Sequence, residues 1–427
     1  MSRSAGGSTE GLIKHGTVLL VATVVTGLSN TLYNIVMGRM LSTEDFGDYY
    51  GLVSLYMILV LPLSAVQTVT ARYVSALESQ RLLGQAAALL RRSIVKLSIM
   101  ALGAIGGFLV FGPLLADYLN IHSLIAVYAI GLAVALAMLS PVFWGALQGF
   151  QYFYHYAANH LGATLAKLAG GILMVWLGFE VAGAVGSLVF FQLAVVLIAL
   201  FPLKMALFKL RGGDREVDSR PHYRFFWSVL VSLLGFAVFS QADILTAKHF
   251  FDRTLGGEFG LAKIVGNAFL FVPIALSTVM FPKVSQHTAS GRKGALRMLN
   301  MTLIYCVLLC GLGILICASI PGLILGVLFP EATEVARELI RIFGLGVTPV
   351  ALLHILINYL LARGRSGFLY LLLPLALCYV IALQLLHTSL ATIIWVMASF
   401  GLGTFILLYL IVLKAERSPG IAQWSAN

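Results

Sequence analysis

Long apolar segments constrain this chain more than any other feature of its sequence. Each runs for about 20 to 25 residues, the length that an α-helix needs to cross the hydrocarbon core of a bilayer. With 60% hydrophobic and 11% charged residues among 427, the chain has more apolar side chains than one soluble core could bury. We therefore predict an all-α polytopic membrane protein rather than a soluble enzyme on a membrane anchor. The predicted transmembrane helices are twelve, beginning near residues 16, 49, 97, 123, 156, 181, 225, 258, 299, 337, 367 and 391.

The distribution of basic residues predicts the orientation of these helices. Lys and Arg gather in the connections after even-numbered segments, as in Arg91 to Lys96 and Arg363 to Arg365. The connections after odd-numbered segments hold mainly acidic residues, such as Glu44, Asp45 and Glu180. The positive-inside rule therefore places both termini in the cytoplasm. The net charge of +11 is then explained by cytoplasmic loops, and no nucleic-acid partner is expected.

The chain also repeats itself at about half its length. GRMLSTEDFGDYYGLVSL leads through Pro62 in the first half, and KHFFDRTLGGEFGLAKIV leads through Pro273 in the second, so both copies carry a proline at which a membrane helix can kink. Phe46 and Gly47 fall on Phe259 and Gly260 at an offset of 213. Parallel repeats of this kind are typical of transporters whose site lies between the two halves. The predicted domains are a cytoplasmic tail at 1–15, a six-helix bundle at 16–203, a linker at 204–224, a second six-helix bundle at 225–413 and a cytoplasmic tail at 414–427.

Polar side chains inside the apolar segments are the candidate functional residues, because each needs a partner, a cavity or water. Lys167 lies near the middle of the fifth segment, with His160 two turns before it. An unpaired ammonium at that depth costs at least about 2.5 to 3.5 kcal/mol, which a hydrated cavity, a bound anion or a carboxylate would offset. Asn30 and Asn34 form a polar stripe along the first segment. We expect these four residues to line a substrate cavity.

The second half offers one acidic and four further polar candidates. Asp243 lies well inside the seventh segment, so a coupling proton or cation could bind there; an ion pair with Lys167, Lys248 or Lys263 is the alternative. The remaining cavity candidates form pairs one helical turn apart, which ordinary interhelical hydrogen bonds would also explain. They are Lys263 with Asn267 and His354 with Asn358.

Four basic residues flank the segments in positions that the repeat pairs. Arg39 and Lys248 follow the first and seventh segments, and Arg72 and Lys283 follow the second and eighth. We expect them at the two mouths of one path, where they would attract an anionic cargo. Snorkelling of each side chain to lipid headgroups is the alternative.

Several chemistries find no support in the sequence. It contains no G-x-x-x-x-G-K-[ST] loop for ATP and no Cys/His pattern for a metal, so neither a cofactor nor a metal is expected. The four cysteines, Cys306, Cys310, Cys317 and Cys378, lie inside apolar segments and read as small hydrophobic residues. The chain is therefore predicted not to be an enzyme.

Two stretches carry a resemblance to a known family. The run from Met37 to Tyr49, with its Gly-Arg and Phe-Gly, and the later run from Ala71 to Ser75 resemble the opening of bacterial polysaccharide biosynthesis flippases. These Wzx-like proteins are the polysaccharide-transporter branch of the MOP superfamily. The resemblance implies two six-helix bundles in a MATE-like V shape around a hydrated cationic cavity. It also implies alternating access and a polyprenyl-pyrophosphate-linked oligosaccharide as cargo, in surface polysaccharide biosynthesis at the bacterial inner membrane.

The resemblance also implies binding partners, and three other classes of membrane protein are alternatives. We expect a monomer that contacts membrane lipids and its lipid-linked oligosaccharide, and that serves a polysaccharide polymerase and export machinery. A multidrug and toxin extrusion antiporter of the same superfamily would need carboxylates in its cavity, and only Asp243 is a candidate for that role. A lipid II flippase usually has two further spans. A membrane polymerase or ligase would need a long periplasmic loop, whereas the longest outer loop, around Phe329 to Glu338, is short.

Overall fold

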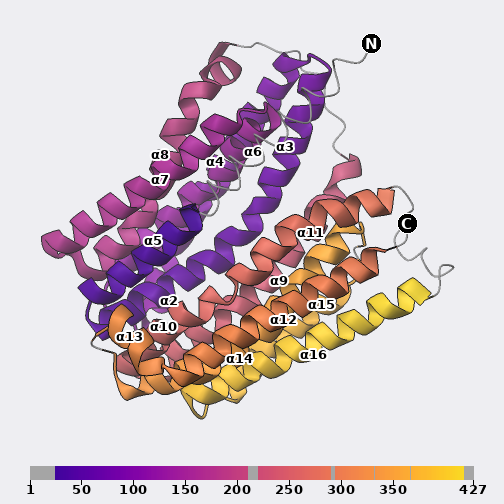
Figure 1. Ribbon diagram of the computed structural model, residues 1–427. Coiled ribbons are helices and arrows are strands. Elements are labelled where there is room, and N and C mark those ends of the chain that lie inside the picture. Colours follow the sequence, from indigo (N-terminus) through magenta and orange to yellow (C-terminus); the bar gives the residue numbers. More distant parts are fainter. Residues whose placement is uncertain (1–24, 210–219, 290–293, 331, 366, 418–427) are drawn as a thin grey trace. The chain divides into compact units, whose positions relative to one another are not determined.

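The structure, a computed structural model, describes residues 25–209, 220–289, 294–330, 332–365 and 367–417. All regular secondary structure in these ranges is helical (Figure 1). The side-chain pattern agrees with a lipid environment, because large apolar residues such as Val110, Trp176 and Leu385 are mostly exposed and would contact acyl chains. The prediction of an all-α polytopic membrane protein is confirmed.

Nine helical segments in the described ranges are long and apolar enough to span a bilayer. One of them, Phe153–Leu207, comprises two helices, because Gly178 adopts a φ of +88° that breaks the helical path between them. These are α7 (Phe153–Met174) and α8 (Glu180–Lys204). Together with the apolar helix Leu369–Leu385 and a helix over residues 25–40, these make twelve helical segments in the described part of the chain. The expected tail at 1–15, the expected start near 16, and parts of the expected linker and of the second tail lie outside the described residues.

The chain divides into two compact units, and the first is built around close helix packing. Unit 1 contains the described residues of Met1–Leu41 and Leu63–Trp227. A Cβ added at Gly145 would lie 2.7 Å from the carbonyl oxygen of Gln67, so the two helices that carry these residues approach backbone to backbone. Besides α7, α8 and the helix over residues 25–40, the α-helices of this unit are α3 (Ser64–Ser79), α4 (Leu83–Tyr118), α5 (Leu124–Ala137) and α6 (Ser140–Gly149).

Unit 2 contains the described residues of Ser42–Pro62 and Ser228–Asn427. Pro62 lies in the short 3₁₀ helix Leu61–Leu63, which follows one α-helix, and Pro273 lies in the first turn of another. Both prolines thus lie at breaks in the helical path, where kinks were expected. The α-helices of unit 2 are α2 (Thr43–Val60), α9 (Arg220–Phe250, from Ser228 onward), α10 (Arg253–Ala268), α11 (Phe271–Ala289), α12 (Ala295–Ser319), α13 (Pro321–Leu328), α14 (Glu334–Ala362), α15 (Leu369–Leu385) and α16 (Leu390–Arg417).

Helix α2 belongs to unit 2, although its residues lie in the expected bundle at 16–203. It comes from the first half of the chain but packs with the second, because a Cβ at Gly47 would lie only 2.8 Å from the backbone nitrogen of Gly257. The Phe-Gly repeat therefore marks a close helix crossing. Helices α2 and α10 also begin earlier than the expected starts near 49 and 258, because Ser42 caps the first turn of α2 and Asp252 that of α10 with side-chain hydrogen bonds.

Candidate functional site

Lys167 of α7 is a buried cation with neutral partners. Its side chain is 6% exposed, and its Nζ donates a hydrogen bond to Asn30 Oδ1 at 2.9 Å. The same ammonium lies 4.6 Å from the ring centroid of Tyr33, whose hydroxyl donates to the carbonyl oxygen of Ala184 at 2.9 Å. Within the described ranges, no carboxylate pairs with Lys167. The Asn30 amide and the Tyr33 ring offset part of the cost of removing the ammonium from water, but neither partner carries a negative charge that would neutralise it.

Lys263 of α10 is equally buried but is neutralised. Its Nζ forms an ion pair with Asp243 Oδ1 of α9 and donates to the carbonyl oxygen of Ser240 at 2.8 Å. The ion pair named as an alternative for Asp243 is therefore present, with Lys263 as the partner. The second carboxylate oxygen, Asp243 Oδ2, is buried and has no hydrogen-bond partner among the described atoms. A role of Asp243 in ion coupling stays a prediction.

The internal repeat relates these two sites. The offset of 213 residues places Asn30 on Asp243, so equivalent positions of the two halves each accept a hydrogen bond from a buried lysine. One position is an amide and the other a carboxylate. A neutral acceptor leaves a full positive charge in unit 1, whereas the carboxylate cancels it in unit 2.

Lys248 lies in a charged network, and its expected place at a mouth stays a prediction. It is fully buried, and its Nζ lies 2.5 Å from Asp48 Oδ1. Arg253 adds contacts with Asp48 at 2.8 Å and with Glu44 and Asp45 at 3.1 Å each. The physical reason for this network is the early start of α2, which carries Asp48 into the helix and gives the lysine an ionic partner.

The other three predicted mouth residues have exposed side chains. Arg39 ends the helix over residues 25–40, Arg72 lies on α3 and Lys283 on α11. Exposure is compatible with a mouth and equally with snorkelling to headgroups. Their role stays a prediction.

His160 lies among aromatic rings in unit 1. Its ring stacks on Trp144 with centroids 4.4 Å apart and lies 4.5 Å from the ring of Tyr156. The Trp144 indole donates to Asn159 Oδ1 at 2.8 Å. His160 Nε2 is buried and has no partner among the described atoms. His160 shares a side of α7 with Lys167, seven residues later, while Asn34 is half-buried one turn after Asn30.

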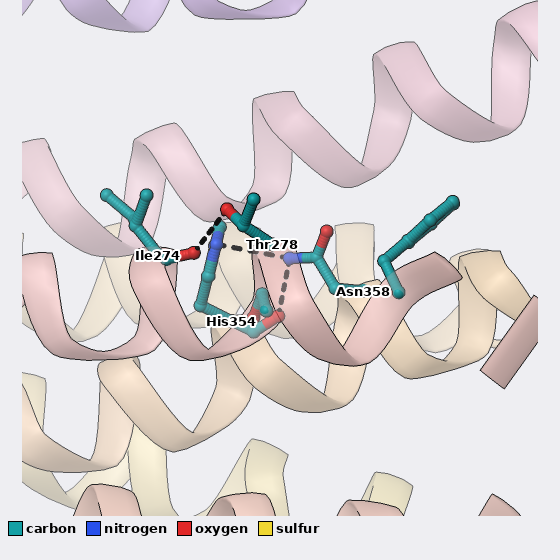
Figure 2. Close-up of a pocket in the computed structure, with 6 residues that line it drawn as sticks. Ile274, Thr278, His354 and Asn358 are labelled. Atoms are coloured by element: carbon teal, nitrogen blue, oxygen red, sulfur yellow. Dashed lines mark hydrogen bonds between the residues drawn. The ribbon is translucent and has the colours of Figure 1, made fainter. Parts of the chain in front are cut away.

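The candidates of unit 2 separate into a packed pair and a pocket. Asn267 Nδ2 donates to the Tyr50 hydroxyl at 2.9 Å, an ordinary interhelical hydrogen bond between α10 and α2. His354 and Asn358 instead line a cavity of about 380 Å³ between α11 and α14 (Figure 2). The bond between these two lies within one helix, since Asn358 Nδ2 contacts His354 Nε2 at 3.1 Å and the His354 carbonyl oxygen at 2.9 Å.

Some residues of these sites were not among the sequence candidates. Tyr33 carries no charge and was therefore not a candidate. Its spacing of three residues from Asn30 places it on the same helical stripe, which is the signal that could have identified it. Asp48 lies just before the expected helix start near 49, Glu258 lies at the expected start near 258, and both are buried. The capping signals at Ser42 and Asp252 could have moved the helix starts and revealed them.

No protein-family model and no curated protein sequence matches the chain. Several solved structures of other proteins are similar to the chain along most of its length. An inward-facing multidrug resistance MATE family transporter of the MOP superfamily is similar with a TM-score of 0.74 and 14% identity, over 96% of this chain and 99% of that one. The lipid II flippase MurJ in an inward closed conformation has a TM-score of 0.71 and 11% identity, over 93% and 87%. The MATE multidrug transporter DinF-BH in complex with R6G has a TM-score of 0.64 and 15% identity, over 94% and 96%. The chain thus has the fold of these transporters.

Proposed function

We propose that the protein is a flippase that moves a polyprenyl-pyrophosphate-linked oligosaccharide across the bacterial inner membrane by alternating access. The observation that carries this proposal is the buried ammonium of Lys167, which has an amide and a tyrosine ring as partners in place of a carboxylate. A fixed positive charge at this depth favours an anionic cargo. The fold shared with MATE and MurJ transporters supports a transporter rather than an enzyme.

Lys167 would bind the pyrophosphate through charge-assisted hydrogen bonds. An ammonium has three donors, and only one of them is taken by Asn30 Oδ1 at 2.9 Å. The others are available for phosphate oxygens, to which such bonds are about twice as strong as neutral ones. Tyr33 holds the ammonium in place from its ring face.

A gene deletion with complementation tests the proposal. We expect the deletion to remove surface polysaccharide and to accumulate the lipid-linked oligosaccharide on the cytoplasmic side, where mass spectrometry of extracted lipids identifies it. Wild type and Lys167→Arg should restore export, and Lys167→Ala should not. Lys204→Ala is the matched control, because Lys204 also lies near an aromatic ring, 4.9 Å from the Phe201 centroid, but is exposed. Normal surface glycan in the deletion strain would contradict the proposal.

A MATE-type antiporter for drugs or small molecules is the second candidate function. The observation that favours it is Asp243 Oδ2, a buried carboxylate oxygen without a partner among the described atoms, which a coupling proton or cation could occupy. Under this hypothesis the deletion strain keeps its surface glycan and becomes sensitive to cationic drugs. Asp243→Asn should then abolish the dependence of transport on a proton or sodium gradient.

A further inference from the structure

The pocket between α11 and α14 has an uncharged lining. Its volume of about 380 Å³ falls in the lower part of the range of roughly 300 to 1,000 Å³ that is usual for small-molecule sites. Both helices belong to unit 2. Among the described residues, the pocket is lined by hydroxyl, amide, imidazole and apolar side chains and by no Lys, Arg, Asp or Glu: Ile274, Ser277, Thr278, Phe281, His354 and Asn358.

Two hydroxyl-bearing residues of α11 line the pocket, Ser277 with a buried hydroxyl and Thr278 with an exposed side chain. Ser277 is 5% exposed, and its Oγ has no hydrogen-bond partner among the described atoms. A buried hydroxyl without a partner is unfavourable, so a Ser277 rotamer that turns Oγ toward the pocket would gain a hydrogen bond from a ligand there. Thr278 Oγ1 donates to the Ile274 carbonyl oxygen at 2.8 Å and keeps its lone pairs as acceptors. Figure 2 shows Thr278 on the side of α11 that faces His354.

The α14 side of the pocket adds one donor and one acceptor. Asn358 Nδ2 can only donate, so its 3.1 Å contact makes His354 Nε2 the acceptor and leaves the ring proton on Nδ1. The same nitrogen also donates to the His354 carbonyl oxygen at 2.9 Å. Both amide protons are thus used, and Asn358 Oδ1 remains an acceptor; in Figure 2 it points away from His354. Within the pair, the ring N–H of His354 and the side-chain oxygen of Asn358 therefore stay free of each other.

We propose that this pocket binds one neutral sugar ring of the cargo. The inference rests on the proposed flippase function and names the part of the substrate that unit 2 recognises. Sugar hydroxyls both donate and accept, as the lining requires, and the carbon–hydrogen face of the ring can pack on Ile274 and Phe281. An organic cation would find no carboxylate here, and an apolar drug would leave Ser277 and Asn358 unpaired.

Sugar binding to the purified full-length protein tests the pocket directly. The probes are glucose, galactose and N-acetylglucosamine as neutral sugars, glucuronic acid as an anion and tetraphenylphosphonium as a cation, each titrated by saturation-transfer NMR. At least one neutral sugar should bind in preference to the acid and the cation. Ser277→Ala and Thr278→Val should each weaken its binding by about three- to tenfold, the usual contribution of one hydrogen bond.

Two matched controls lie outside the pocket. Ser54 also has a buried, unpartnered Oγ, so Ser54→Ala repeats the chemistry of Ser277→Ala on α2. Thr302 Oγ1 donates to the Met298 carbonyl oxygen at 2.8 Å, so Thr302→Val repeats that of Thr278→Val on α12. Both controls should keep the sugar affinity within twofold of wild type. Equal effects of pocket and control variants, or preferred binding of the cation or the acid, would overturn the proposal.

A photoreactive derivative of the preferred sugar gives a second measurement that needs no substitution. Crosslinks should map to α11 or α14 and disappear with excess free sugar; crosslinks confined to other helices would overturn the pocket. The outcome is separable from the flippase proposal. Normal lipid-linked export with a sugar affinity unaffected by Ser277→Ala contradicts the pocket alone, and pocket-dependent sugar binding without such export contradicts the flippase alone.

Discussion

Lys167 in unit 1 and Lys263 in unit 2 are both buried ammonium groups, and they differ in the charge of the residue that accepts their hydrogen bond. Asn30 and Asp243 occupy equivalent positions of the repeat, and each accepts from a lysine. A single difference, amide against carboxylate, leaves one unit with a free positive charge and the other with a neutral pair. We infer that the first pair is arranged to take an anion and the second to hold helices together.

The largest expected effect comes from removing the carboxylate of unit 2. Asp243→Ala leaves the Lys263 ammonium buried without its counter-charge, and breaking a buried pair in this way costs about 3 to 5 kcal/mol. The thermal unfolding midpoint of the purified protein should fall accordingly. Asn30→Ala, which removes a neutral partner, should lower the midpoint by less. Equal losses would contradict the distinction between the two lysines.

A second change tests whether α2 belongs to the core of unit 2. A Cβ on Gly257 would lie only 2.7 Å from the backbone carbonyl carbon of Thr43, so Gly257→Ala must force α10 away from α2. Overpacking of this kind costs about 1 to 3 kcal/mol, measurable as a lower unfolding midpoint. Gly103→Ala on α4 is the control, because no atom lies within 4 Å of its added Cβ. An unchanged midpoint for Gly257→Ala would show that the two helices are not packed this closely.

A third substitution gives the buried lysine of unit 1 the same kind of acceptor as the lysine of unit 2. Asn30→Asp would place a carboxylate on the Lys167 ammonium and neutralise it. We expect export of the lipid-linked oligosaccharide to fall by tenfold or more, equivalent to about 1.4 kcal/mol, while the unfolding midpoint stays equal or rises. Export is measured in the complemented deletion strain. Full export by Asn30→Asp would exclude a role for the free charge of Lys167.

The fold was predictable because its determinants are local. Lengths of apolar segments define the spans, and Pro62 and Pro273 mark the kinks, so neither requires knowledge of tertiary contacts. The helices begin several residues before the expected starts, at Thr43, where the first turn is acidic, and at Arg253, where an aspartate caps the helix. The expected start near 49 leaves Asp48 outside the helix, so the ion pair between Asp48 and Lys248 is not predictable from the sequence.

The site was predictable only as a set of residues. Lys167 and Asn30 were both expected in a cavity, but the hydrogen bond between them joins positions 137 residues apart, which no periodicity reveals. The pocket shows the same limit, since Ser277 and Thr278 are unremarkable hydroxyls in an apolar helix until α11 packs on α14. Pairing is a property of the packed helices rather than of either segment.

The smallest expected effect concerns the tyrosine that supports Lys167. Tyr33→Phe keeps the ring beneath the ammonium but removes the hydrogen bond to the Ala184 carbonyl oxygen, a loss of about 0.5 to 1.5 kcal/mol in stability. Export should fall by less than threefold, because the cation–π contact remains. Tyr33→Leu removes the ring as well, so it should reduce export further and, because Tyr33 is fully buried, lower the unfolding midpoint more than Tyr33→Phe does. If the two variants export equally well, Tyr33 serves the packing of unit 1 alone and Lys167 is positioned by Asn30.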